Sequence, residues 1–131
     1  MSSKSIRLEV SPGETIDKLT ILEIKSERME NEVKLINVRH ELDVLMSIRD
    51  LCIPYTARLD ELTAELKSVN EILWEIEDDI RECEAAKDFS QTFVELARAV
   101  YVTNDQRADL KREINVLLGS SIIEEKSYSP Y

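Results

Sequence analysis

Four acidic side chains recur along one face of a predicted helix, and their spacing could serve metal chemistry. Glu71, Glu75, Asp78 and Glu82 follow one another in steps of four, three and four residues. Residues three and four apart are neighbours on a helix surface, so these carboxylates could converge on Mg²⁺. That cation prefers oxygen ligands and can itself bind a diphosphate. The simpler interpretation, which we favour, is a solvated acidic face that binds no cofactor.

The metal hypothesis gives an alternative function, that of an all-α, divalent-metal-dependent nucleotide (pyro)phosphohydrolase. Such helical enzymes typically carry an E-E-x-x-E cluster on one helix and an E-x-x-D cluster on the next. Here Glu75-x-x-Asp78 fits the second cluster, and no segment fits the first. The sequence has no glycine-rich phosphate loop, and His40, the only histidine, has no nucleophile next to it. We therefore name no catalytic residue.

Polar residues interrupt the apolar pattern of the last predicted helix. Asn104 and Arg107 lie where Val100 and Leu110 predict core positions. Burying a guanidinium without a carboxylate costs several kcal/mol, so we expect Arg107 to pair with an acid or to reach water. Two interpretations stay open: a buried polar layer that fixes helix register, or a contact with a ligand or partner.

Two aromatic residues lie off the main apolar pattern. Trp74 is adjacent to Leu73 but not on its stripe, and Tyr101 follows Val100. Such aromatic side chains are often the anchors of protein interfaces, although packing beside the core is the competing explanation. The interaction candidates are Trp74, Tyr101, Asn104 and Arg107.

A long helix over about 55–86 must position most of these residues. From Tyr55 to Cys83 the apolar positions follow in steps of four and three without interruption. An average step of about 3.5 residues places them on one stripe of a helix, as in a coiled-coil seam. We call this stripe the seam. The members of the seam are Tyr55, Leu59, Leu62, Leu66, Val69, Leu73, Ile76, Ile80 and Cys83.

The first helix is predicted over about 12–50, after an extended arm at 1–10. Ser11, Pro12 and Glu14 form a capping box with proline in its tolerated place. Two apolar stripes run along this segment, which predicts that it contacts its own bundle on one side and a second subunit on the other. Proline disfavours helical geometry in the preceding residue, so this helix must end before Pro54.

A third helix is predicted over about 89–118, with Asp88 as its N-cap and Gly119 just after its end. A tail follows over 119–131. Long helices joined by short corners fold back on one another. The expected architecture is all-α, an antiparallel three-helix bundle that forms a single domain over residues 1–131.

Charge and composition narrow the classes of function. The 131 residues carry a net charge of −10, and residues 55–88 alone carry eleven acidic and four basic side chains. An acidic protein repels phosphate backbones and anionic lipid, so we expect neither nucleic-acid nor membrane binding. No apolar run of about 18 residues is present, and the start lacks the apolar block of a secretory signal. The chain is expected to be cytoplasmic.

Four segments resemble a small family of bacterial and phage helical proteins, a domain of unknown function. They are SPGETIDKLTILEIKSER at 11–28, VNEILWEIEDDIRECEAAKDF at 69–89, LARAVYVTNDQRADLKREIN at 96–115 and EEKSYSPY at 124–131. The resemblance spans nearly the whole chain and implies no activity, so no functional residue is carried over. Together these observations predict a non-enzymatic helical protein that acts through protein–protein interaction or oligomerisation, as a homodimer with a possible further protein partner.

Overall fold

The computed structural model describes residues 4–131, which form an all-α structure without strands. Its four helices are α1 (Pro12–Arg28), α2 (Glu32–Cys52), α3 (Ala57–Ala85) and α4 (Gln91–Leu117). Residues 4–10 of the predicted arm have an extended, exposed backbone. Residues 1–3 of that arm lie outside the described part of the chain. None of the described helices is both long and apolar enough to cross a membrane.

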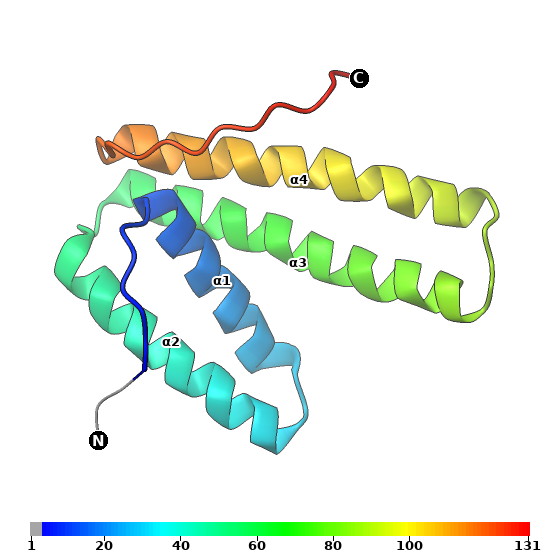
Figure 1. Ribbon diagram of the computed structural model, residues 1–131, viewed down its shortest axis with the longest axis horizontal. Coiled ribbons are helices and arrows are strands. Elements are labelled where there is room, and N and C mark those ends of the chain that lie inside the picture. Colours follow the sequence, from blue (N-terminus) through cyan, green and yellow to red (C-terminus); the bar gives the residue numbers. More distant parts are fainter. Residues whose placement is uncertain (1–3) are drawn as a thin grey trace.

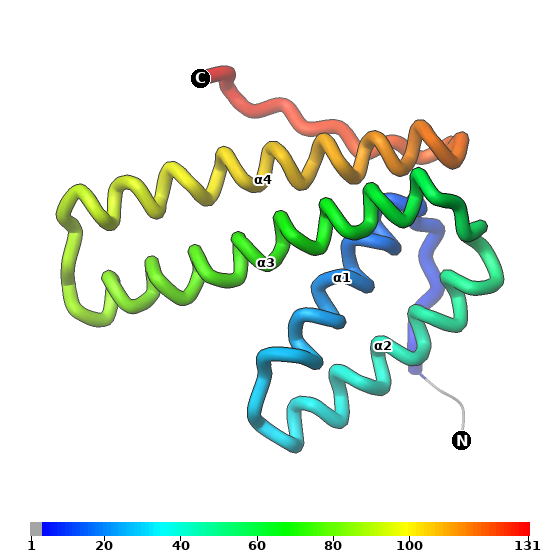
Figure 2. The backbone as a smooth tube through the Cα atoms, turned by 180° about the vertical axis from the view of Figure 1, so that it is seen from behind, coloured from blue at the N-terminus to red at the C-terminus, as the bar shows by residue number. Residues whose placement is uncertain are grey.

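The four helices form two antiparallel pairs of unequal length (Figure 1). α1 and α2 make a short hairpin, and α3 and α4 make a longer one that extends well beyond it, as the view from behind also shows (Figure 2). The core lies where the start of α1, the end of α2, the start of α3 and the end of α4 meet. Its buried side chains are Ile16, Leu19, Ile53, Leu59, Leu62, Leu66 and Ile114.

The prediction of three helices was wrong, because the segment expected as one helix over about 12–50 is two. α1 ends at Arg28, and both Met29 and Asn31 have extended backbone angles. The side chain of Asn31 then accepts a hydrogen bond from the backbone N–H of Lys34 at 3.0 Å. Asparagine is among the best N-cap residues, so Asn31, which lies inside the segment predicted as one helix, begins a second helix.

The start of α1 confirms Ser11 as the predicted N-cap but forms only half of the predicted capping box, because the Glu14 carboxylate pairs with Lys111 of α4. Ser11 is the N-cap, and its hydroxyl accepts the backbone N–H of Glu14 at 3.1 Å. Gly13 has a second role, because α4 passes very close to it. A Cβ atom at this position would lie 2.4 Å from the backbone oxygen of Lys111. Glycine is therefore required here by the close approach of another helix.

Except for Tyr55, which precedes the helix and is exposed, the seam lies on α3 as predicted, and its burial changes along the helix. Leu62 and Leu66 are 1% and 0% exposed, whereas Leu73 and Ile80 are half-buried. The reason is that the first half of α3 contacts α1 and α4, while the second half has only α4 beside it (Figure 1). Two helices alone leave part of each apolar stripe uncovered.

The turn between α3 and α4 corrects one predicted cap. Lys87 follows the C-cap of α3 with a φ of +53°, in the left-handed region. Asp88, predicted as the N-cap of the last helix, lies two residues before the observed N-cap, Ser90. The hydroxyl of Ser90 lowers the pKa of the Asp88 carboxyl, as does the backbone N–H of Ser90, which donates to that carboxylate at 3.0 Å. Gly119 ends α4 with a φ of +65°, as expected for a glycine after a helix.

Candidate functional site

A buried carboxylate, Asp17, connects three helices. Its side chain is 1% exposed and accepts hydrogen bonds from Arg107 Nε at 2.9 Å and Nη2 at 2.5 Å. Asn70 Nδ2 donates to Asp17 Oδ1 and to Thr20 Oγ1, both at 2.9 Å. Asp17 and Thr20 belong to α1, Asn70 to α3 and Arg107 to α4. Because each group is satisfied by the others, this polar cluster can remain in an apolar setting.

The Asp17 carboxylate also stabilises the charged form of Arg107. Its hydrogen bonds raise the pKa of Arg107 above the usual value for a guanidinium. The side chain is 30% exposed, so the guanidinium is held by an acid on one side and reaches solvent on the other. A guanidinium has five N–H donors. Two of those of Arg107 donate to Asp17, and the other three can donate hydrogen bonds to a bound ligand.

A row of polar contacts aligns α1 along α4. The backbone N–H of Gly13 donates to Asn115 Oδ1 at 2.7 Å, and Lys111 Nζ donates to Glu14 Oε2 at 2.6 Å. With Asp17 and Arg107, the contacts step forward on α1 and backward on α4. These helices are therefore antiparallel, whereas the three-helix prediction had the first and last helices parallel.

A cleft of about 510 Å³ opens beside this cluster, where α1 diverges from the α3/α4 pair. α1 contributes Lys25 and apolar side chains, α3 contributes Trp74 and several polar residues, and α4 contributes Asn104 and Arg107. Three of the four predicted interaction candidates thus line one cleft. Its full lining is Ile21, Ile24, Lys25, Asn70, Leu73, Trp74, Glu77, Asp78, Arg81, Asn104 and Arg107.

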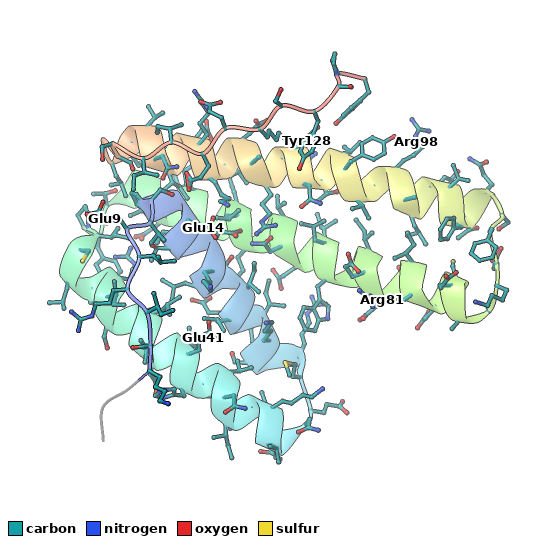
Figure 3. The ribbon with its side chains drawn as sticks, viewed as in Figure 1. Glu9, Glu14, Glu41, Arg81, Arg98 and Tyr128 are labelled. Carbon is teal, nitrogen blue, oxygen red and sulfur yellow. The ribbon has the colours of Figure 1, made fainter. Side chains whose placement is uncertain are left out.

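Several polar side chains of the cleft have no partner within the described residues. The side chains of Lys25, Asp78 and Asn104 make no hydrogen bond or ion pair anywhere in residues 4–131. Arg81, by contrast, pairs with Glu77 at 3.1 Å, and it lies on the stretch of α3 that extends beyond α1 (Figure 3). The cleft therefore offers one unpaired cation, one unpaired carboxylate and one amide beside an indole ring.

The fourth interaction candidate, Tyr101, lies outside this cleft. It is 43% exposed, and its ring packs edge-to-face on Tyr131 of the C-terminal tail, with ring centroids 5.1 Å apart. Asp105 accepts hydrogen bonds from Lys126 and from the hydroxyl of Tyr131. The tail therefore follows α4 back along its length (Figure 1), and Tyr101 is one of its contacts.

The acidic residues considered for Mg²⁺ do not gather at one point. Arg28 lies 3.6 Å from Glu71 and 3.5 Å from Glu75, so two of the four carboxylates have a cation beside them. Asp78 lines the cleft, and Glu82 lines a separate hollow near the α3–α4 turn. Across residues 4–131, no three histidine, cysteine or acidic side chains are arranged to hold a metal ion.

Sequence reasoning missed Asp17, Lys25 and Asn70 as members of the site. Asp17 and Thr20 share a helix stripe with the buried Ile24, since the steps between them are three and four residues. A charged residue on a buried stripe was the available signal. Asn70 had a weaker one, because it follows Val69 of the seam and looks like a flanking polar residue.

Comparison with known proteins places the chain in a family. No curated protein matches the sequence, and no solved structure matches the fold. A family model does match, and it covers residues 6–131. The chain belongs to this family, which is described as a family of unknown function (DUF6165).

Proposed function

We propose that this chain is a non-enzymatic, cytoplasmic helical protein that acts by binding other proteins, as a homodimer that presents one cleft per subunit. The observation that carries the proposal is the cleft itself. It gathers Trp74, Asn104 and Arg107 with the unpaired side chains of Lys25 and Asp78. A volume of about 510 Å³ falls within the range of ligand pockets.

The chemistry of the cleft suits a segment of a protein partner. Tryptophan and arginine are the residue types that most often anchor protein interfaces. The amide of Asn104 can bond a peptide backbone, since it both donates and accepts. Lys25 and Asp78 can pair with one acidic and one basic side chain. A partner segment with both charges would therefore satisfy both groups.

The cleft is also held in place before any partner arrives. Arg107 is fixed by Asp17, and Asp17 is fixed by Asn70. Side chains that are already ordered lose less conformational freedom on binding, which favours affinity. The buried polar cluster thus supports the binding surface from behind.

The proposal can be tested with charge-reversed variants on α1. Proteins captured by the wild-type chain from its own cell extract are purified and titrated against it. Lys25→Glu is the test variant and Lys18→Glu is the control, since Lys18 has the same charge on the same helix but does not line the cleft. We expect Lys25→Glu to weaken binding more than about tenfold, or about 1.4 kcal/mol, and the control to bind normally.

Trp74 gives an independent readout of the same binding. It is the only tryptophan of the chain, so its fluorescence reports occupancy of the cleft directly. A partner bound in the cleft should shift or quench this emission. Equal affinity for Lys25→Glu and wild type, together with an unchanged Trp74 spectrum, would show that partners bind elsewhere.

A further inference from the structure

The outer face of α2 carries large aliphatic side chains that nothing in the described chain covers. Val33 is 73% exposed, Ile36 is 65%, and Leu51 is 86%. Val44 and Ile48 are about half exposed, at 45% and 48%. Over the 18 steps from Val33 to Leu51 a helix rises about 27 Å. The exposed aliphatic residues are therefore spread along the length of α2.

These residues form one stripe, which we call the outer stripe. At about 100° per residue, its members lie within about 60° of one direction. Leu35, Val38, Leu42, Leu45 and Arg49, which face the rest of the fold, point the opposite way. The outer stripe comprises Val33, Ile36, Asn37, His40, Val44, Ser47, Ile48 and Leu51.

The absence of charge from this stripe is unusual for the molecule. Charged residues make up 34% of the chain, yet none of the eight members of the outer stripe is charged. On α3, by contrast, the solvent-exposed positions Glu75, Asp79 and Glu82 are all acidic. The exposed charged residues of α2, such as Glu41 (Figure 3), flank the stripe. A face of this kind is typical of a protein–protein contact.

The order of residues in the stripe is self-complementary. Reversing it about position 42 brings Val33 opposite Leu51, Ile36 opposite Ile48 and His40 opposite Val44, while Asn37 meets Ser47. A two-fold interface requires this property, because residue i then contacts residue j and j contacts i. Aliphatic residues meet aliphatic ones near the ends, and the two short polar side chains meet each other.

We propose that the outer stripe of α2 packs antiparallel against the same stripe of a second copy of this chain, about a two-fold axis that crosses the helix at the level of position 42. The inference rests on the proposed homodimer and specifies its surface and direction. A single helix pair buries less than the roughly 800 Å² per partner of a stable interface, so the dimer is reversible. The arm adds exposed Ile6 and Leu8 beside the same hairpin (Figure 1).

Cysteine pairing tests the antiparallel direction. His40→Cys and Val44→Cys are made separately in a Cys52→Ser, Cys83→Ser background, which removes both native thiols. Under mild oxidation a mixture of the two variants should form a disulfide-linked heterodimer. Each variant alone should couple far more slowly, because the antiparallel arrangement offsets identical positions by about 6 Å along the helices. Equally fast coupling of either variant with itself would indicate parallel helices and overturn the proposal.

A charge substitution separates this inference from the homodimer itself. Val44→Glu should raise the dimer dissociation constant more than tenfold in sedimentation experiments. Val116→Glu, at a 67% exposed valine on α4, is the matched control and should leave dimerisation intact. If Val44→Glu remains a dimer as stable as wild type, α2 is not the interface but the homodimer stands. If the wild-type chain is monomeric throughout, both fail.

Discussion

Asp17 and Arg107 form an ion pair, and we predict that substitutions of the two residues destabilise the fold by different amounts. Asp17 is 1% exposed, whereas the Arg107 side chain is 30% exposed. In Asp17→Asn, the guanidinium can turn toward solvent and regain water. In Arg107→Met, the carboxylate stays buried and keeps only the hydrogen bond from Asn70. We therefore expect Arg107→Met to destabilise the fold more than Asp17→Asn.

The magnitude follows from the cost of leaving a charge unpaired. Removing one partner of a buried ion pair typically costs about 3–5 kcal/mol, and this range applies to Arg107→Met. Asp17→Asn loses charge-assisted hydrogen bonds but strands no buried charge, which corresponds to about 1–3 kcal/mol. For a chain of this size, about 3–5 kcal/mol lowers Tm by roughly 10–20 °C.

Urea denaturation followed by circular dichroism at 222 nm measures these free energies of unfolding. The double variant Asp17→Asn, Arg107→Met completes the cycle, and it should be more stable than the sum of the single effects predicts. The reasoning is refuted if Arg107→Met costs no more than Asp17→Asn, or if the two effects simply add. Addition would mean that the two side chains do not depend on each other.

Three further predictions follow from other parts of the structure. Gly13→Ala should lower the free energy of unfolding by about 1–3 kcal/mol in the same denaturation assay, because the added methyl group would lie 2.4 Å from the backbone oxygen of Lys111. An unchanged urea midpoint would contradict the close approach of α4 to Gly13. Acid should release the C-terminal tail from α4, because Lys126 and Tyr131 lower the pKa of Asp105. The contact of these two residues with the Asp105 carboxylate is therefore fully formed above about pH 4 and is lost as the pH falls through the lowered pKa. Backbone NMR shifts of the last residues should follow that titration, and shifts that stay constant would count against it. Millimolar Mg²⁺ should leave Tm unchanged, since no three acidic, histidine or cysteine side chains in residues 4–131 are arranged to hold a metal ion; a clear rise would revive the metal hypothesis.

The parts of the fold predicted correctly depend on local signals. The regular spacing of apolar residues was sufficient to predict the seam from Leu59 to Ile80. Ser11 and Pro12 were sufficient to predict the start of α1. Both patterns act within one helix, where sequence distance determines spatial distance. The end of α1 had no proline or glycine to mark it. Asn31 was the one residue that marked the break between α1 and α2. A polar residue at such a position can equally be a solvent-facing residue within one long amphipathic helix.

The site was harder to predict because it depends on how separate helices meet. Arg107 was expected to need an acid, and the structure supplies Asp17. Choosing that acid from the sequence required knowing that α1 is antiparallel to α4, which the undivided first helix concealed. Trp74 and Asn104 were identified as unusual by their departure from apolar spacing. Lys25 lies on the first predicted helix, and its position beside Arg107 could not be predicted for the same reason.

Sedimentation equilibrium of the unmodified chain tests most directly whether this protein works through association. The measurement covers concentrations from about 5 to 200 µM, which spans the range expected for a reversible contact between small interfaces. We predict that the average mass rises from near the chain mass of 15.1 kDa toward twice that value. A mass that stays at 15.1 kDa over the whole range would contradict the proposed homodimer.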